Sequence, residues 1–361
     1  MTMSYEEYAA LCAVGGRPIT KGKDFARLPD ETDAWNFGVL QPDHPGHLQL
    51  DKSQQAIIAS AKAAMPEFRI NGEWKGEQKK IILWDVFKQK TLIDCPAYAP
   101  LKGRMYPGNW QLTGSCVGVG SGDAATGIAA TEVVVAHQPE EAVIVFWPYH
   151  YGRGRLASGI RGRGDGSTSE GQVEALQKDG VLRWDAAGPA GLPPFEDKGA
   201  GLQIGESQEM KWSDGAVVSQ ELLLTGRKNP VKTGAVCRGR DDAVAAITNG
   251  YWIMWCGNWG GLMKCPVVDG ALLNRKSGSW SHNETCIAYW FHDTLGLLFG
   301  IKNQWGDAHG SDPGGLPTGS YWIKADDFDW QARGGSCIIV SNFDGFPARP
   351  DVFVDWNTLP V

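Results

Sequence analysis

The order of local patterns along the chain is the strongest constraint on its fold. Helical patterns dominate the first half, as in the segment 51–64, where Asp51 is a suitable helix cap and apolar residues recur at helical spacing. The longest helical candidate is 115–136. After Cys265 the chain consists of strand-length apolar runs separated by glycine and proline. Helices followed by strands predict an α+β fold.

The remaining segments are expected to add further helices, strands and loops to this α+β fold. The chain shows no repeat and no low-complexity stretch. Further helices are expected at 4–14, 168–178 and 241–248, strands at 80–92, 142–147, 251–256, 285–291, 297–302, 320–324 and 336–341, and loops at 20–45 and 151–167.

Composition excludes several classes of protein. The 47 glycines and 16 tryptophans among 361 residues indicate a loop-rich chain with an aromatic core, not a helical bundle. The net charge of −7 argues against a nucleic-acid-binding surface, which would have to be basic. The sequence lacks an apolar run long enough for a transmembrane helix.

The cysteines and the N-terminal residues indicate a reducing environment. Eight cysteines in 361 residues are too dilute for a disulfide scaffold, and no C-x-x-C pair occurs, so zinc ribbons and thioredoxin-type motifs are excluded. The first residues lack the basic and apolar regions of a secretory signal. We therefore expect a cytoplasmic protein or a component of a virus or phage particle.

Cys116 is the sharpest candidate for chemistry, because it stands at the start of the helix predicted over 115–136. The positive end of a helix lowers the pKa of a thiol, and its N–H groups can stabilise an oxyanion. Gln111 could add a side-chain donor. We expect Cys116 to be a partly exposed thiol of low pKa. Glycines 118, 120 and 122 in the first turns indicate close approach of neighbouring chain.

A histidine and an asparagine farther along complete a chemical set. His282 precedes an apolar strand, and Asn303 follows 21 residues later (303 − 282). Taken alone, His282 is a hydrogen-bonded histidine at a strand end and Asn303 a turn residue. Taken with Cys116, they supply the nucleophile, the base and the orienting group of a thiol-based triad.

Several motifs then resemble the papain-like cysteine peptidases. Gly114-Ser115-Cys116 resembles the core of the family's cysteine signature, and IKNQWGDAHG at 301–310 resembles its asparagine motif, IKNSWG-x-x-WG. Residues 319–329 resemble the GY-x-x-I strand that follows it, and 243–255 resemble the family's helix-then-strand stretch. Residues 162–180 resemble its glycine-rich substrate loop and the next helix. The five motifs occur in the family's order across roughly residues 100–345.

This resemblance implies a fold and a set of roles. The fold would be papain-like, with a helical subdomain headed by the Cys116 helix packed against an antiparallel sheet or barrel. Cys116 would be the nucleophile, His282 the base and acid, and Asn303 the group that orients the imidazole. Gln111 and the Cys116 backbone N–H would form the oxyanion hole. The substrate-binding residues would be Gly164, Gly166 and Trp305, with Trp305 also shielding the His–Asn hydrogen bond from water.

The chain also departs from the family pattern. Thr113 replaces the additional cysteine of the signature, so the family's disulfide from that position is absent, and Val117 replaces the usual aromatic residue. Gln111 stands five residues before Cys116, where the family usually has six. His309 stands where the second tryptophan of the asparagine motif is expected. The 166 residues from Cys116 to His282 (282 − 116) indicate an insertion around 184–231.

Two weaker groups have ordinary explanations. His44 and His47, with nearby aspartates that include Asp51, could bind a metal, but their spacing favours a polar loop. The arginines between 153 and 163 form a basic cluster in a glycine-rich stretch, which is usually solvated and could otherwise bind an anionic partner. We expect neither a metal nor another cofactor.

These observations leave two main hypotheses for function. The first is a cysteine peptidase that hydrolyses peptide or isopeptide bonds of a polypeptide substrate. The second is a papain-fold structural subunit, with little or no activity, of a large assembly such as a phage or virus particle. A cell-wall amidase of related fold has less support from the asparagine motif.

The expected organisation is an N-terminal extension at 1–100, a papain-like domain at 101–345 and a C-terminal tail at 346–361. The extension does not resemble the family's pro-segment. The stretch 20–45 has too few periodic apolar residues to fold alone. We expect residues 1–50 to wrap around a partner or a second copy of the chain, with no nucleic acid or membrane involved.

Overall fold

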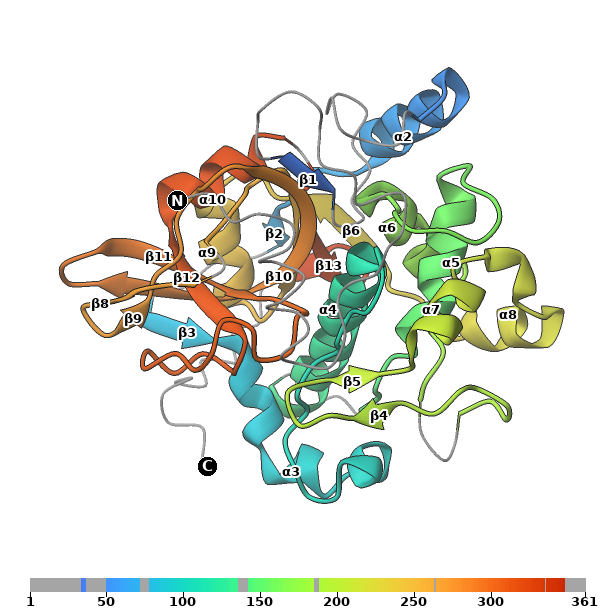
Figure 1. The fold of residues 1–361 in the computed structure, drawn as a ribbon, viewed down its shortest axis with the longest axis horizontal. Helices are drawn as coiled ribbons and strands as arrows, with labels where there is room; N and C mark the ends of the chain where they lie inside the picture. The colour runs from blue at the N-terminus through green and yellow to red at the C-terminus, as the bar shows by residue number, and fades with distance from the viewer. Residues whose placement is uncertain are drawn as a thin grey trace.

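The chain folds into a helical half and a sheet half that meet along one buried helix, α4 (Cys116–Val134) (Figure 1). The computed structural model describes residues 34–36, 50–71, 78–135, 142–184, 188–262, 264–334 and 336–347. The arrangement confirms the predicted α+β class, with the Cys116 helix packed against an antiparallel sheet.

The helical half contains most of the predicted helices. Asp51 caps α2 through the backbone N–H of Gln54, and Thr168 caps α6 through the N–H of Gly171, as their residue types favour. The helices of this half are α2 (Lys52–Ala64), α3 (Lys90–Ile93), α4, α5 (Trp147–Ala157), α6 (Ser169–Lys178), α7 (Glu206–Trp212) and α8 (Gln220–Gly226), with 3-10 turns at Leu83–Lys88, Pro96–Leu101 and Gly215–Val217. Two further helices, α9 (Arg240–Thr248) and α10 (Ala325–Ala332), pack on the sheet (Figure 1).

The sheet half is a mainly antiparallel sheet that carries the C-terminal strands in the order β12-β11-β10-β7-β13-β6. Short β3 pairs antiparallel with β10, and β1 pairs parallel with it. The strands of this sheet are β1 (Ala34–Asn36), β3 (Lys80–Ile82), β6 (Thr233–Val236), β7 (Trp252–Gly257), β10 (Ser279–His292), β11 (Gly296–Lys302), β12 (Ser320–Lys324) and β13 (Ile338–Ser341). Two-stranded pairs are β2 (Ile70–Asn71) with β14 (Phe346–Pro347), β4 (Glu196–Asp197) with β5 (Leu202–Gln203), and β8 (Val267–Val268) with β9 (Ala271–Leu272).

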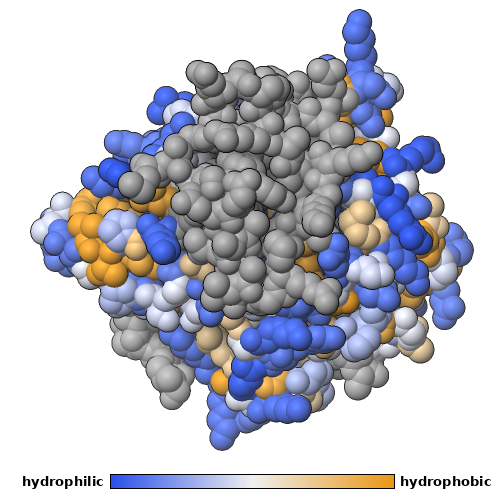
Figure 2. All heavy atoms as spheres, viewed as in Figure 1, coloured by the Kyte–Doolittle hydropathy of each residue, from blue (hydrophilic) through white to orange (hydrophobic). Residues whose placement is uncertain are grey.

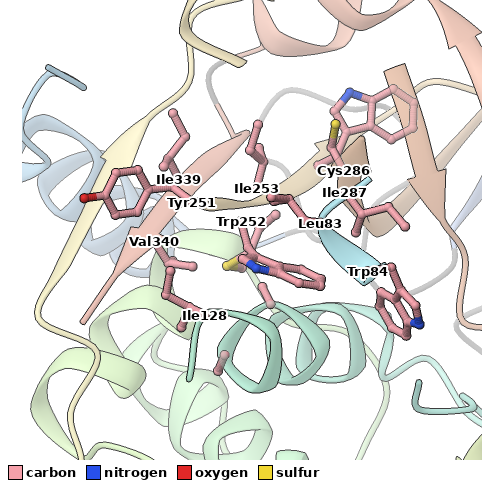
Figure 3. Close-up of a cluster of buried hydrophobic side chains, with 14 of the residues drawn as sticks. Leu83, Trp84, Ile128, Tyr251, Trp252, Ile253, Cys286, Ile287, Ile339 and Val340 are labelled. Carbon is pink, nitrogen blue, oxygen red and sulfur yellow. The ribbon is translucent and has the colours of Figure 1, made fainter. Parts of the chain in front are cut away.

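The core fills the space between α4 and the sheet. Trp252 of β7 lies over α4, and its indole N–H donates to Thr131 Oγ1 at 2.9 Å (Figure 3). Ile128 of α4 and Val340 of β13 are fully buried in the same cluster. Each buried aliphatic side chain of this size contributes about 1.5–3 kcal/mol relative to exposure. The aromatic core that the composition indicated therefore joins the two halves.

The glycines in the first turns of α4 allow close approach, as predicted. An added Cβ at Gly118 would lie 2.5 Å from the Tyr151 Cβ of α5, and one at Gly120 would lie 2.2 Å from the Asn283 Nδ2 of β10. Both distances are shorter than a carbon atom tolerates. The absence of side chains at these positions therefore brings α5 and β10 against the turn that carries Cys116.

Three predictions of local structure, at 142–147, 151–167 and 80–92, are wrong wholly or in part. The apolar run 142–147 is not a strand, because Val145 makes only one bridge, to Arg183, and the chain then enters α5 at Trp147. Pro148 suits the first turn of a helix, where its missing N–H is not needed. Helix α5 extends to Ala157, so much of the loop predicted at 151–167 is helical.

The strand predicted at 80–92 ends at Ile82. A 3-10 turn over Leu83–Lys88 and then α3 follow. The side chains of Leu83, Trp84, Val86 and Phe87 are all buried, so the segment does not alternate between two faces as a half-exposed strand would. Trp84 and Phe87 pack in an aromatic cluster with Tyr106.

Little of the N-terminal extension before α2 lies within the described residues. The helix predicted at 4–14 and the candidate metal ligands His44 and His47 lie outside them. Residues 34–36 form β1, which pairs with Ser279–Ser281, directly before His282, within the same chain. Asp51 serves as a helix cap. The prediction that residues 1–50 wrap around a partner stays a prediction.

The visible surface is mixed in polarity. Figure 2 shows hydrophobic side chains gathered at the β8–β9 hairpin, where Val267 is 58% exposed. Among the described residues, no helix combines the length and the apolar character needed to cross a bilayer.

Candidate active site

Cys116 is the first residue of α4, as predicted. Ser115 occupies the cap position, but its hydroxyl donates to a glutamate of α7 and makes no capping hydrogen bond. The N–H groups in the first turn of a helix have no acceptor within the helix. The backbone N–H of Cys116 is in this position and suits an oxyanion that forms beside its thiol.

His282 and Asn303 are brought together by neighbouring strands. His282 lies in β10, and Asn303 directly follows β11, which pairs with β10. The His282 Nε2 lies 3.1 Å from the Asn303 Oδ1, and the backbone N–H of Gln304 donates to the same oxygen at 2.7 Å. This second bond identifies Oδ1 as an acceptor, so His282 Nε2 carries the hydrogen in the bond between them.

Trp305 covers this pair. Its ring stacks on His282 with centroids 4.6 Å apart and planes 23° apart, and Trp305 is 5% exposed. Its indole N–H donates to Gln111 Oε1 at 3.2 Å. That this ring shields the His–Asn bond from water stays a prediction.

Gln111 joins the two halves of the site. Its backbone N–H donates to Gln304 O at 2.9 Å, and its side-chain Nε2 donates to Thr113 O at 2.7 Å. The side-chain amide is thus held by Thr113 on one side and Trp305 on the other. Its place in the oxyanion hole stays a prediction.

The Cys116 helix and the His282 strand are in direct contact. Asn283, the residue after His282, donates from Nδ2 to Cys116 O at 3.2 Å. Thr285 of the same strand donates to Gly120 O at 3.1 Å. These bonds fix β10 against the first turns of α4, although the pairing of the thiol with the imidazole stays a prediction.

The expectation of a partly exposed Cys116 with a low pKa is wrong for this conformation. Cys116 is fully buried, and burial raises the pKa of its thiol above the usual range. Burial likewise lowers the pKa of His282 to about 3, against the opposing effect of its bond with Asn303. Loss of hydration thus outweighs the helix terminus, and both groups are neutral at pH 7.

His309 is a site residue that the sequence analysis did not assign. Its Nε2 lies 2.9 Å from the Asn303 Nδ2, so it accepts from the amide that orients His282. Its Nδ1 lies 3.7 Å from the Sγ of Cys265. The sequence feature that could have identified His309 is its position in the asparagine motif, where it replaces a tryptophan.

Three buried ionisable groups lie behind the site. Burial raises the pKa of Asp123 to about 6 and that of Glu284 to about 8. Burial lowers the pKa of Lys302 to about 8. The Lys302 ammonium donates to Asn303 O at 2.7 Å, which links this group to the catalytic candidates.

The glycine-rich loop packs against the turn before Cys116. The Gly166 N–H donates to Gly114 O at 2.9 Å, and its carbonyl accepts from Arg155. The Gly164 N–H donates to Ser213 Oγ at 3.0 Å. These backbone groups are used within the chain, and the substrate-binding role of both glycines stays a prediction. Arg155 is a buried structural residue here, which excludes it from a solvated basic cluster.

No group of three or more metal-ligating side chains with suitable geometry occurs within the described residues. All seven cysteines described there carry free thiols.

Comparison with known proteins finds similarity at the level of solved structures. No protein-family model matches the chain, and no curated protein matches it in sequence. The chain is similar to xylellain, a cysteine protease from Xylella fastidiosa, with 15% identity, a TM-score of 0.47, and coverage of 76% of this chain and 91% of xylellain. It is also similar to procathepsin L 3 of Tenebrio molitor larval midgut, with 10% identity, a TM-score of 0.45 and coverage of 81% of each chain. Similarity to procathepsin B S9 from Trypanosoma congolense has 11% identity, a TM-score of 0.45, and coverage of 78% and 87%. In its fold the chain resembles the papain-like cysteine peptidases.

Proposed function

We propose that the protein is a cysteine peptidase that hydrolyses peptide or isopeptide bonds through an acyl-enzyme on Cys116. One observation carries the proposal. The His282 imidazole is bonded to Asn303 at 3.1 Å beneath the Trp305 ring, on a strand fixed against the helix that begins at Cys116. A base oriented by a third group beside a thiol is the arrangement that nucleophilic catalysis requires.

The hydrogen bond with Asn303 determines which nitrogen acts. Because Nε2 is held by Asn303, Nδ1 of His282 would accept the Cys116 proton as sulfur attacks the substrate carbonyl. The oxyanion would be stabilised by the Cys116 N–H, and by Gln111 if its amide reaches the oxygen. His282 would then return the proton to the departing amine. Water attack on the thioester, with His282 again as base, would release the acid and restore the thiol.

The Cys116 thiol and the His282 imidazole are both neutral, and this determines how the thiol would be activated. With the pKa of His282 at about 3 and that of Cys116 raised, no thiolate–imidazolium pair is stored before substrate binds. Proton transfer would therefore accompany attack, and His282 would act as a general base.

The proposal predicts selective labelling of Cys116 by a peptide-like, thiol-directed epoxide. The full chain is incubated with the reagent, and adducts are located by peptide mass mapping. We expect one adduct, on Cys116, that is absent from Cys116→Ser and retained in Cys265→Ser, since Cys265 is a half-exposed thiol beside the same site. Small iodoacetamide should instead favour the partly exposed Cys95, because Cys116 is buried and burial raises the pKa of Cys265 to about 12.

The burial of Cys116 favours the second candidate, a structural subunit of a larger assembly that retains the fold without activity. A peptide-like epoxide that labels only half-exposed thiols, or none, together with no cleavage of a peptide library, would support this candidate and reject the peptidase.

A further inference from the structure

We propose that Glu209 of α7 is a positioning residue, whose carboxylate holds the turn before Cys116 in the shape that presents the thiol and its backbone N–H. This inference rests on the proposed peptidase function. Glu209 lies within 184–231, the stretch for which the motifs supplied no role.

The contacts of Glu209 converge on one short turn. Its Oε2 accepts from the Thr113 N–H at 3.0 Å, the Thr113 hydroxyl at 2.8 Å and the Ser115 hydroxyl at 2.8 Å. The Leu112 N–H donates to Oε1 at 3.1 Å. Four donors from three residues within the five positions before Cys116 thus reach one carboxylate that is fully buried.

The other backbone N–H groups of this turn also have hydrogen-bond acceptors. The Gln111 N–H donates to Gln304 O, and the Gly114 N–H donates to Asp165 Oδ1 at 2.7 Å. The backbone N–H groups from Gln111 to Gly114 therefore all have acceptors within the chain. Under the proposed mechanism this turn positions the Cys116 N–H, at the first position of α4, as a donor to the oxyanion.

The ionised carboxylate matches this set of donors best, because both of its oxygens only accept. A protonated carboxyl, or a glutamine amide, would place a hydrogen against one of them and break the set. Burial raises the pKa of Glu209 to about 7, while its bonds with Thr113 and Ser115 oppose the shift. The carboxylate is thus lost as the pH falls through about 7, and the turn should loosen in that range.

Other ionisable groups near α7 have partners of their own. Arg153 of α5 pairs with Asp179 at 2.6 Å, and Arg155 donates to carbonyls of the glycine-rich loop. His150 contacts Ser121 Oγ, and burial lowers its pKa to about 4. The remaining ionisable groups on the elements packed against α7, and on α7 itself, are Tyr149, Tyr151, Asp165, Glu206, Lys211, Asp214 and Cys116. Among the described residues no salt bridge reaches Glu209, so its hydrogen bonds and its burial determine its charge.

The test is hydrogen exchange of the turn, combined with the pH profile of the site. The variant is Glu209→Gln, which preserves shape, and the control is Glu206→Gln on the same helix. We expect protection of the Leu112 and Thr113 amides to fall about 10- to 100-fold in Glu209→Gln, the factor that corresponds to loss of a hydrogen bond to a charged group. The control should keep wild-type protection. Unchanged protection in Glu209→Gln would overturn the inference.

The pH profile separates positioning from a merely structural contact. In wild type, both kcat/KM for peptide cleavage and epoxide labelling of Cys116 should show a step near pH 7, lower on the acid side. Glu209→Gln should be slow and lack this step, and a variant that keeps the step would contradict the inference. If Glu209→Gln does not fold, wild type alone can be measured. Protection of the Leu112 and Thr113 amides should then decrease below pH 7, while protection of the β10 amides stays constant. Protection of Leu112 and Thr113 that does not change with pH would reject the proposal.

Failure of this inference differs from failure of the proposed function. A wild-type protein that cleaves no peptide, with the exchange results as expected, would reject the peptidase and support the role of Glu209 in holding the turn. A protein that cleaves peptides normally, with turn protection independent of Glu209, would do the reverse.

Discussion

Replacing His282 with alanine should lower kcat/KM for peptide hydrolysis by about 10⁴- to 10⁶-fold, as removal of the base in comparable triads does. Under the proposed mechanism the loss follows because Cys116, whose pKa is raised by burial, would need a base at the moment of attack. His292→Ala is the matched control, since His292 ends the same strand β10 and lies away from the site. The measurement is cleavage of a fluorogenic peptide library, with the melting temperature showing that each variant folds.

The same assay should rank the other site residues. Asn303→Ala should leave residual activity, because the base remains while its orientation is lost. Gln111→Ala should cost about 10²- to 10³-fold if its amide contributes to the oxyanion hole. Full activity of Gln111→Ala would show that the bond from Nε2 to Thr113 O keeps the amide away from the oxyanion. Equal activity of His282→Ala and wild type would remove His282 from the mechanism.

Replacing Lys302 with methionine should destabilise the protein by about 3–5 kcal/mol at pH 7.5, the usual cost of leaving a buried charge without its partner. Lys302 is fully buried and is attracted by Asp123, which is ionised at this pH because its pKa is about 6. The measurement is the free energy of unfolding in urea. Lys178→Met, which removes an exposed lysine of α6, should change it by less than about 0.5 kcal/mol.

The pH dependence gives this prediction a second check. As the pH falls through about 6, Asp123 takes up a proton, so the buried negative charge disappears and the penalty of Lys302→Met should shrink at pH 5. The sign follows because Lys302 lowers the pKa of Asp123, so the folded variant without Lys302 binds this proton more tightly than folded wild type does and regains stability as the pH falls. The double variant Asp123→Asn with Lys302→Met should recover part of the lost stability. A penalty for Lys302→Met that is identical at both pH values would argue against this charge pair.

The fold could largely be predicted where the hydrophobic periodicity of a segment matches its burial in the structure. Helix α4, strand β12 and the capped helix α2 follow from periodicity and capping residues. The segments 80–92 and 142–147 could not be assigned, because their apolar residues are buried on all sides, with Val143 alone partly buried, and periodicity then no longer separates strand from helix. Pro148 was the available signal for a helix start.

The site could be predicted only in part, because its residues were identified by type and order. His282 and Asn303 were chosen correctly as neighbours, since a thiol site needs a base and an orienting group. The pKa of Cys116 was mispredicted because the helix-end argument is local, whereas burial depends on α5 and β10, which are remote in sequence. Glu209 could not be found from sequence, since a buried carboxylate is recognised only by the donors that surround it.

The burial of the thiols has a consequence for resistance to oxidation. Peroxides attack the thiolate, and burial raises the pKa of Cys116 and of the four other buried thiols, which are Cys237, Cys256, Cys286 and Cys337. Under the proposed mechanism the thiolate would form only during attack, so little of it would be available to a peroxide between turnovers. Oxidation should therefore begin at the partly exposed Cys95 and spare Cys116, the proposed nucleophile.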